Sequence, residues 1–181
     1  MVFVPPTWLN GMLIMASYII IPIIIGIILF IVLGIKNKPV MGITLLILFI
    51  LIGCFGSWYL WWDNYEVPSV QTKVVTVDSW QPKAGIHTNE KGMMVIDNAD
   101  QLMLVTTDGE AFLNEENFLF QKFDTRDLLN TLKPGVKANL TYYGWREGFN
   151  SGFPNILNVT VIDDSNATNV TVGDYFGTKL V

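Results

Sequence analysis

The chain has 181 residues, of which 51% are hydrophobic and only 15% are charged, and its formal net charge is −5. Soluble domains carry about 25% charged residues, so this composition excludes an ordinary soluble protein. All 16 acidic residues follow Trp62, together with nine of the 11 basic ones, which gives that part a formal charge of −7. The sequence therefore predicts a membrane segment followed by one polar domain of about 115 residues, a common domain size.

Two charge-free runs, 9–35 and 40–62, are expected to form transmembrane helices after a short N-terminal segment, 1–8. Each run exceeds the roughly 20 apolar residues that cross about 30 Å of hydrocarbon. Pro22 lies inside the first run and is expected to bend that helix. A cleaved signal peptide is disfavoured because the N-terminus lacks the basic region and the short apolar core that such peptides need. The runs carry no charged side chain of the kind that marks an ion pathway, which favours an anchor.

The orientation of the hairpin follows from its connector, 36–39, which carries Lys36 and Lys38. The positive-inside rule predicts that this connector lies in the cytoplasm. Trp8 and the aromatic residues of 58–62 fall at the other ends of the runs, where the membrane interface attracts aromatic rings. We therefore predict a two-pass protein of the plasma membrane with both chain ends extracytoplasmic.

Residues 67–163 are expected to form an extracytoplasmic β domain, with 164–181 as a polar and loosely ordered tail. The predicted strands are β-branched or alternating runs at 73–77, 92–96, 102–107, 110–113, 136–143 and 156–162. Residues 97–100 predict a turn between the second and third strands, and Asp108-Gly109 predicts a tight hairpin turn.

One short helix is predicted at 125–132, with Asp124 as its N-cap and Lys133-Pro134-Gly135 as its stop. Several strands, one helix and two further strands fit a small, partly open barrel of the oligonucleotide/oligosaccharide-binding (OB) type. A β-sandwich is the alternative, although it usually needs about seven strands. The predicted fold is an α-helical transmembrane hairpin followed by an OB-like, β-rich domain.

Residues that carry metal or covalent chemistry are scarce, since His87 is the only histidine and Cys54 the only cysteine. Two helices and an external β domain are also the layout of subunit II of haem–copper oxidases, but the outer domain lacks the imidazole and thiolate ligands of a copper centre. A structural zinc site and an intrachain disulfide are excluded in the same way. A Ser–His–Asp set would depend on His87, which lies in a turn-like stretch, 81–92. We predict no cofactor, no metal and no catalytic activity.

Four Asn-x-Ser/Thr sequons lie in the part that is predicted to be external, at Asn139, Asn158, Asn166 and Asn169. Glycosylation needs an exposed site in a compartment that contains the transferase. The two sequons in the polar tail are therefore better candidates than the two in predicted strands.

The stretch 142–155 joins the last two predicted strands and carries five aromatic residues, three glycines and one arginine. A solvated loop rarely exposes so much apolar surface. In one interpretation, its Trp and Phe side chains plug the open end of the barrel and Arg146 pairs with a nearby acid. In the other, the loop is a binding surface for a partner protein or the bilayer, because Trp, Tyr and Arg dominate such contacts. The candidate binding residues are Tyr143, Trp145, Arg146, Phe149 and Phe153.

Three motifs in this region carry a resemblance to a known family. Tyr-Gly-Trp-Arg at 143–146, Phe-Pro-Asn-Ile at 153–156 and Lys-Phe-Asp-Thr-Arg-Asp-Leu at 122–128 resemble small membrane-anchored proteins of unknown function from bacteria and their phages. The resemblance implies an external, anchored β domain and no particular activity. The chain departs from the family pattern in its two spans instead of one, and in Glu147-Gly148-Phe149, where a proline-containing apolar triplet is expected.

The leading functional hypothesis is a membrane-anchored, non-enzymatic accessory module that contacts a membrane or envelope protein, or a second copy of the chain. One alternative is an envelope ligand binder or enzyme with a site near His87 and Arg146. Another is an accessory two-helix subunit of a larger membrane complex, with the outer domain as its cap. Nucleic acid is excluded as a partner by the acidic charge of the domain and by its location.

Overall fold

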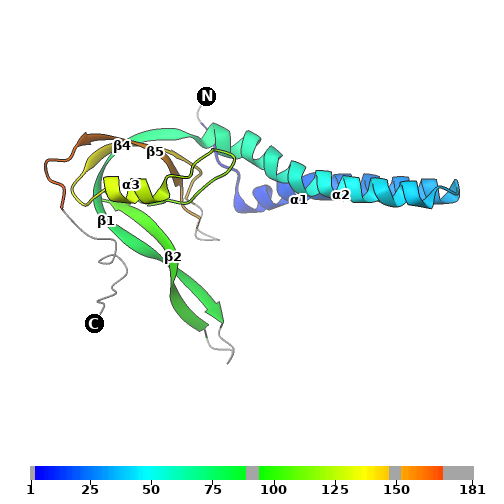
Figure 1. Cartoon of the computed structure of the whole chain (residues 1–181), viewed down its shortest axis with the longest axis horizontal. Helices are drawn as coiled ribbons and strands as arrows, with labels where there is room; N and C mark the ends of the chain where they lie inside the picture. Colours follow the sequence, from blue (N-terminus) through cyan, green and yellow to red (C-terminus); the bar gives the residue numbers. More distant parts are fainter. Residues whose placement is uncertain (1–2, 89–93, 147–151, 169–181) are drawn as a thin grey trace. The chain divides into compact units, whose positions relative to one another are not determined.

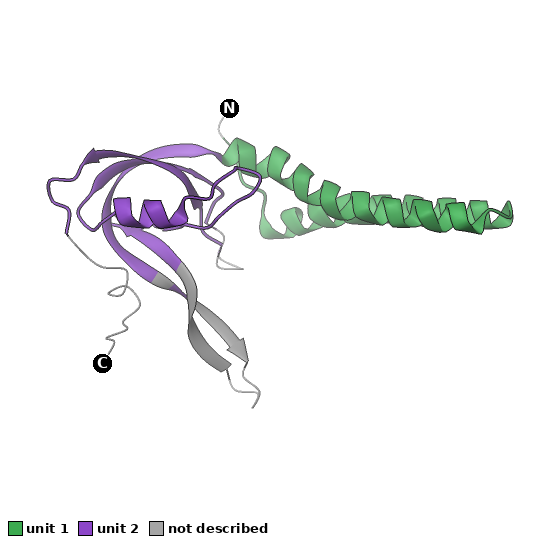
Figure 2. Ribbon diagram, in the orientation of Figure 1, with its two compact units in different colours: residues 1–69 green, residues 70–181 purple. Residues whose placement is uncertain are grey.

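The computed structural model describes residues 3–88, 94–146 and 152–168, with the backbone alone at 82, 84–88 and 94–101. The chain forms two compact units, 1–69 and 70–181 (Figure 2). The first unit is helical, and the second contains a β-sheet and one short helix (Figure 1).

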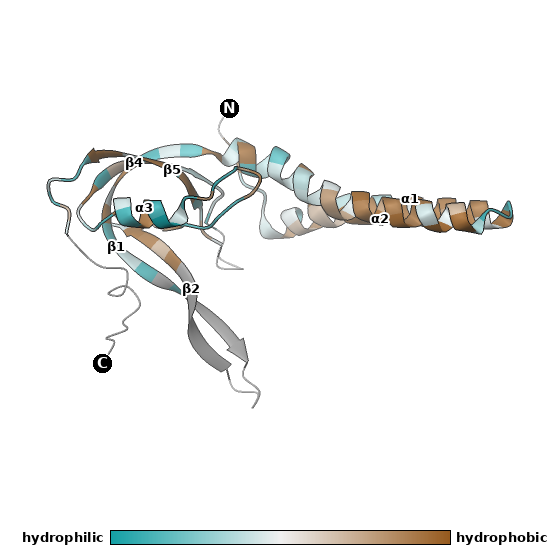
Figure 3. Cartoon of the chain, viewed as in Figure 1, coloured by the Kyte–Doolittle hydropathy of each residue, from teal (hydrophilic) through white to brown (hydrophobic). Residues whose placement is uncertain are grey.

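The helical unit is a hairpin of two long helices, α1 at Trp8–Ile35 and α2 at Pro39–Trp61. A π-helical turn at Trp62–Glu66 and a 3-10 turn at Val67–Ser69 extend α2. Both helices are strongly hydrophobic along their length (Figure 3), and they expose many large apolar side chains. Each is long and apolar enough to span a membrane. The predicted pair of apolar helices is confirmed.

Small residues let the two helices of the hairpin approach each other closely. A methyl group on Gly53 would lie 3.1 Å from the carbonyl oxygen of Ile19, and one on Gly42 would lie 3.2 Å from that of Phe30. Ser57, one turn beyond Gly53, is also buried. Such small-residue contacts increase the van der Waals packing that holds helices together in lipid, where the hydrophobic effect between them is absent.

The second unit contains a mixed sheet of five strands that differ in length. They are β1 at Gln71–Thr88, β2 at Met94–Thr106, β3 at Ala111–Leu113, β4 at Lys137–Tyr143 and β5 at Asn155–Asp163. The strands pair in the order β1-β2-β3-β5-β4, and β4 pairs back to β1. The pairs are antiparallel except β3 with β5, which is parallel and rests on Leu113 opposite Asn155. The helix α3, Thr125–Thr131, lies between β3 and β4 in the chain.

Strand β1 is long because it pairs with two neighbours in turn. Residues 71–76 pair with β4, and residues 77–88 pair with β2. A register shift between Pro82 and Ala84 accommodates the proline, which has no N–H to donate to a ladder. Beyond this shift, β1 and β2 continue as a two-stranded ribbon (Figure 1).

Two predicted turns, at 81–92 and 97–100, are wrong in the part of the chain that is described. Asp97 pairs with Gly85 in the β1–β2 ladder, so the turn-forming residues lie inside one continuous strand. Local turn propensity is outweighed here because each strand supplies backbone partners along the length of the other. His87 accordingly lies in β1.

Other local predictions fare better. Asp108-Gly109 forms the β2–β3 turn, with Gly109 at a φ of 84°, and α3 ends one residue before the predicted end. Asp124 occupies the N-cap position of α3 but makes no side-chain capping hydrogen bond. The prediction of Asp124 as the N-cap residue is therefore confirmed for its position in the chain.

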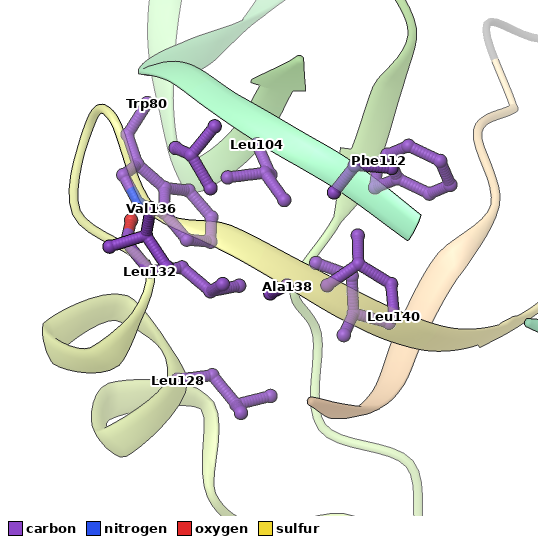
Figure 4. Packing of buried hydrophobic residues seen from close by; sticks show 11 residues of the cluster. Trp80, Leu104, Phe112, Leu128, Leu132, Val136, Ala138 and Leu140 are labelled. Atoms are coloured by element: carbon purple, nitrogen blue, oxygen red, sulfur yellow. Dashed lines mark hydrogen bonds between the residues drawn. The ribbon is translucent and has the colours of Figure 1, made fainter. Parts of the chain in front are cut away.

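The core of this unit lies between the strands and α3 (Figure 4). Its buried members are Val75, Val77, Trp80, Leu104, Phe112, Leu128, Leu132, Val136, Ala138, Leu140 and Ile156. The indole Nε1 of Trp80 donates a 2.7 Å hydrogen bond to the carbonyl oxygen of Leu132, which satisfies the polar group of the buried ring. Tyr142 packs against Phe112 in an edge-on contact with ring centroids 5.0 Å apart. The core thus reaches the end of β4, where the candidate site begins.

Candidate functional site

The chain turns sharply where β4 ends, and this turn forms one wall of a groove. Gly144 follows β4 with a φ of 83°, a conformation that residues with a side chain rarely adopt. The groove has a volume of about 560 Å³ and is lined by the β2–β3 turn, β3, the end of β4 and the segments on either side of 147–151. Its aromatic and charged lining residues are Glu110, Phe112, Tyr142, Trp145, Arg146 and Phe153.

The groove brings together three of the predicted binding residues, Trp145, Arg146 and Phe153. Phe149 lies outside the described residues. The groove also includes Phe112 and Tyr142, which belong to β3 and β4 and were not among the predicted binding residues. Their alternating pattern marks them only as strand residues, and no local signal shows that their edges reach a groove.

Arg146 is held by the loop itself. Its Nη1 donates a 2.9 Å hydrogen bond to the carbonyl oxygen of Gly152, and its guanidinium carbon lies 3.8 Å from the centroid of the Phe153 ring. A cation over an aromatic face at an exposed site is worth about 0.5–1 kcal/mol. In the described ranges both ion pairs involve Lys73, so the predicted pairing of Arg146 with an acid is not seen among these residues.

The acidic side chain of the groove, Glu110, is paired with a neighbouring lysine that it shares with Asp108. Nζ of Lys73 lies 2.8 Å from Oε1 of Glu110 and 2.7 Å from Oδ2 of Asp108. The hydrogen bond from Lys73 lowers the pKa of Asp108, and the two carboxylates raise the pKa of Lys73. Arg146 is exposed and therefore brings the positive charge that a ligand in the groove meets.

Tyr143 has a structural role on the other side of the strand from Tyr142. Its hydroxyl accepts hydrogen bonds from Nδ2 of Asn117 at 2.7 Å and from Nδ2 of Asn155 at 3.2 Å. Its ring packs against Phe120, with centroids 4.4 Å apart. Because successive side chains of a strand point to opposite faces, Tyr143 braces the neighbouring loop while Tyr142 lines the groove.

That neighbouring loop, 114–124 between β3 and α3, is built on buried polar contacts, and we call it the Phe118 loop. Lys122 is only 4% exposed, and its Nζ donates to Oδ1 of Asn114 at 2.8 Å and to the carbonyl oxygen of Glu115 at 2.9 Å. Burial lowers the pKa of Lys122 to about 8, because the ammonium group loses its hydration. Lysines are rarely buried, so nothing in the sequence singled out this residue.

The base of the Phe118 loop is tied to β5 by Asn155. Oδ1 of Asn155 accepts from the backbone N–H of Glu115 at 2.9 Å, and its Nδ2 donates to the carbonyl oxygen of Glu115 at 3.0 Å. Asn155 is itself buried. This side chain therefore satisfies both backbone groups of one loop residue and fixes the loop to the sheet.

The remaining predicted sites lie apart from the groove. His87 lies near the far end of β1, opposite Val95, whereas the groove includes Gln71 at the start of that strand. The structure therefore does not bring His87 and Arg146 together in one site. Within the described ranges no group of three or more His, Cys, Asp or Glu side chains is placed to hold a metal ion.

The three sequons within the described residues differ in their exposure. Asn158, in β5, and Asn166, after it, are exposed, whereas Asn139, in β4, is half-buried. Oδ1 of Asn158 accepts a hydrogen bond from the backbone N–H of Val159. Asn169 lies outside the described residues. By exposure alone, Asn158 and Asn166 are the better placed acceptors.

No family model, no curated protein and no solved structure matches this chain. The resemblance of its aromatic loop to small membrane-anchored proteins therefore stays a prediction.

Proposed function

We propose that this protein is a membrane-anchored interaction module whose external β domain binds a segment of a partner protein in the aromatic groove. The α1–α2 hairpin serves as the anchor, and the domain acts outside the cytoplasm as a binding accessory, not as a catalyst. The observation that carries the proposal is the convergence of Trp145, Arg146 and Phe153 on one groove.

The distribution of apolar surface supports anchoring. Large side chains such as Ile28 (54% exposed) and Phe55 (67% exposed) cover the outside of the hairpin. An apolar surface of this extent is unfavourable in water and natural in lipid. Lys36 and Lys38, next to the turn between the helices, favour a cytoplasmic position for that turn, which leaves the β domain on the opposite side.

The strand order and the place of α3 support an OB-type barrel. The order β1-β2-β3-β5-β4 returns to β1, and the helix lies between β3 and β4 in the chain. OB domains bind ligands with the face of strands 2 and 3 and with the loops that follow strands 1 and 4. The groove includes residues of β3 and of the loop after β4, which are the elements that such domains use for binding.

The groove has the chemistry of a protein-binding surface. Half-buried aromatic rings provide apolar contact area at a low cost in side-chain entropy, and Trp, Tyr and Arg are enriched where binding energy concentrates. The guanidinium of Arg146 uses one face for Phe153 and one N–H for Gly152. Its other N–H groups are available for a carboxylate or a carbonyl of the partner.

Crosslinking and copurification of the full chain from its native membranes test this proposal. Trp145→Ala and Arg146→Ala are each expected to reduce recovery of the crosslinked partner at least tenfold, because they remove the main apolar and charged contacts of the groove. Arg126→Ala is the matched control, since Arg126 is an exposed arginine on α3 and should leave recovery unchanged. Limited proteolysis shows whether each variant keeps its folded β domain.

Two results would contradict the proposal. The first is a wild-type protein that leaves native membranes as an isolated monomer after crosslinking. The second is undiminished partner recovery with both groove variants. Recovery that depends on the helices alone, shown by exchanging both spans for unrelated ones, would instead favour the two-helix subunit.

A further inference from the structure

The Phe118 loop exposes aromatic side chains although its base is buried. Phe118 is 72% exposed and Phe123 is 61% exposed, whereas Lys122 between them is 4% exposed. Single exposed apolar residues are common on protein surfaces. Here, however, the polar residue is inside and the aromatic residues are outside, which is the reverse of what a solvated loop favours.

Side-chain contacts hold the turn that carries Phe118 in one shape. Oδ1 of Asn117 accepts from the backbone N–H groups of Leu119 at 2.9 Å and Phe120 at 3.1 Å, and its Nδ2 donates to the Tyr143 hydroxyl at 2.7 Å. Packing of Phe120 against Tyr143 adds a second brace. Because the backbone of the turn is already ordered, Phe118 can enter an apolar phase without a further cost for ordering the loop.

The loop is attached to the end of the sheet at which β1 begins. Gln71, the first residue of β1, pairs with Tyr142, and the next residue, Tyr143, holds the turn. Only Val70 separates β1 from Ser69, where the extension of α2 ends. If α2 crosses the membrane, this end of the β domain is the one at which the chain leaves the bilayer.

We propose that Phe118 inserts into the interfacial layer of the bilayer, so that the Phe118 loop is a second membrane contact of the β domain. The inference rests on the anchoring part of the proposed function. Residues 63–69 follow the aromatic residues expected at the interface and rise by about 10 Å as a helix. Phe118 lies four residues beyond Asn114, and an extended chain of that length spans at most about 14 Å. The maximum span of this part of the loop therefore exceeds the rise of residues 63–69.

The bilayer is the occupant favoured by the chain itself. It is the apolar phase that the covalent connection through Val70 brings to this end of the domain. Glu116, which is exposed two residues before Phe118, limits the depth of insertion because a carboxylate must stay hydrated. A position in the interfacial layer allows the ring of Phe118 to enter the apolar phase while the polar residues of the loop stay hydrated.

A fluorescent label at position 118 of the full chain tests this inference. Cys54 is first changed to Ser, so that Phe118→Cys can be labelled alone with an environment-sensitive fluorophore. The protein is reconstituted into vesicles of phosphatidylcholine and phosphatidylglycerol, some of which carry nitroxide on the lipid headgroup or upper acyl chain. Nitroxide lipids are expected to quench the label at 118 at least twofold. Asp164→Cys is the control, because Asp164 is exposed beyond the far end of β5 and its label should not be quenched.

The anchor is measured separately by flotation of the same vesicles after an alkaline wash. If the protein does not float with the vesicles, the proposed membrane anchor is wrong. If it floats, the anchor is established, and the quenching then tests the loop alone. In a floating protein, a label at 118 that aqueous iodide reaches and nitroxide lipids do not would overturn the inference. Protection from both quenchers would also overturn it, since it indicates that the loop is covered by protein, from the same chain or from a second copy.

Discussion

The helical hairpin and the β domain distribute their apolar residues in opposite ways. In the hairpin, large side chains such as Ile28 are exposed, and the buried residues are small, as at Gly26 and Gly53. In the β domain, large side chains such as Leu104 and Leu140 are fully buried. The same kinds of residue therefore face opposite surroundings in the two units: they cover the outside of the hairpin and fill the inside of the β domain.

Truncation of an apolar residue should reveal this difference most strongly. Leu104→Ala in the β domain is expected to cost about 2–5 kcal/mol of unfolding free energy, because it removes buried contacts and leaves a cavity. Ile28→Ala in the hairpin should change stability by less than about 0.5 kcal/mol, since its side chain meets lipid in both states. Denaturant unfolding of the reconstituted chain, followed by tryptophan fluorescence, measures both. Equal losses would mean that the outer surface of the hairpin is packed against protein.

The buried lysine of the β domain should make its stability depend on pH, whereas α1 and α2 carry no charged side chain. The pKa of Lys122 is about 8 in the folded state and about 10.4 in an unfolded chain. Between these values the unfolded state binds more protons, so stability rises with pH, by up to about 3 kcal/mol. Lys122→Met should remove this rise. Lys137→Met, at an exposed position in β4, is the control and should keep it.

That pH dependence is measured by denaturant titrations at a series of pH values between 7 and 11. The quantity of interest is the difference in slope between wild type and Lys122→Met, because other groups titrate in both proteins. Identical slopes would show that Lys122 is hydrated in solution and that the Phe118 loop is looser than its hydrogen bonds indicate.

A matched pair of glycines tests the close packing inside the hairpin, with a smaller expected effect. Gly53→Leu should destabilise the hairpin by about 1–3 kcal/mol, because overpacking forces the helices apart, and a first added carbon already lies 3.1 Å from the Ile19 carbonyl oxygen. Gly56→Leu adds the same side chain where nothing lies within 4 Å and should be nearly neutral. Unfolding of the hairpin in a detergent titration measures the difference. Equal effects would contradict the helix contact.

Features with a local cause were predictable from the sequence. The apolar helices could be located because a lipid-facing helix needs an uninterrupted apolar run, and α1 begins at Trp8, one residue before the expected start. The turn at Asp108-Gly109 was visible because its geometry favours glycine. The loop after β4 was conspicuous because it is unusually rich in aromatic residues. Its members Trp145, Arg146 and Phe153 do meet in the groove.

Features with a nonlocal cause were missed. Asp97 belongs to a turn-forming segment, but Gly85 on the facing strand gives its backbone a partner. Lysine is a residue type that is usually exposed. The burial of Lys122 is possible because Asn114 and Glu115 accept hydrogen bonds from its ammonium group. In the same way, the hydrogen bonds from Asn117 and Asn155 to the hydroxyl of Tyr143 join segments far apart in the sequence, so they could not be predicted.

Because β1 changes its partner along its length, its backbone hydrogen bonds should open more readily at one end than at the other. Amides of residues 71–76 belong to a strand whose partner, β4, is itself paired to β5, whereas residues 84–88 pair with β2 in the two-stranded ribbon. A two-stranded ribbon is marginally stable in water. We therefore expect hydrogen exchange to be slow at the start of this strand and fast at its end, so that one continuous backbone would join a protected part of the domain to one that opens readily.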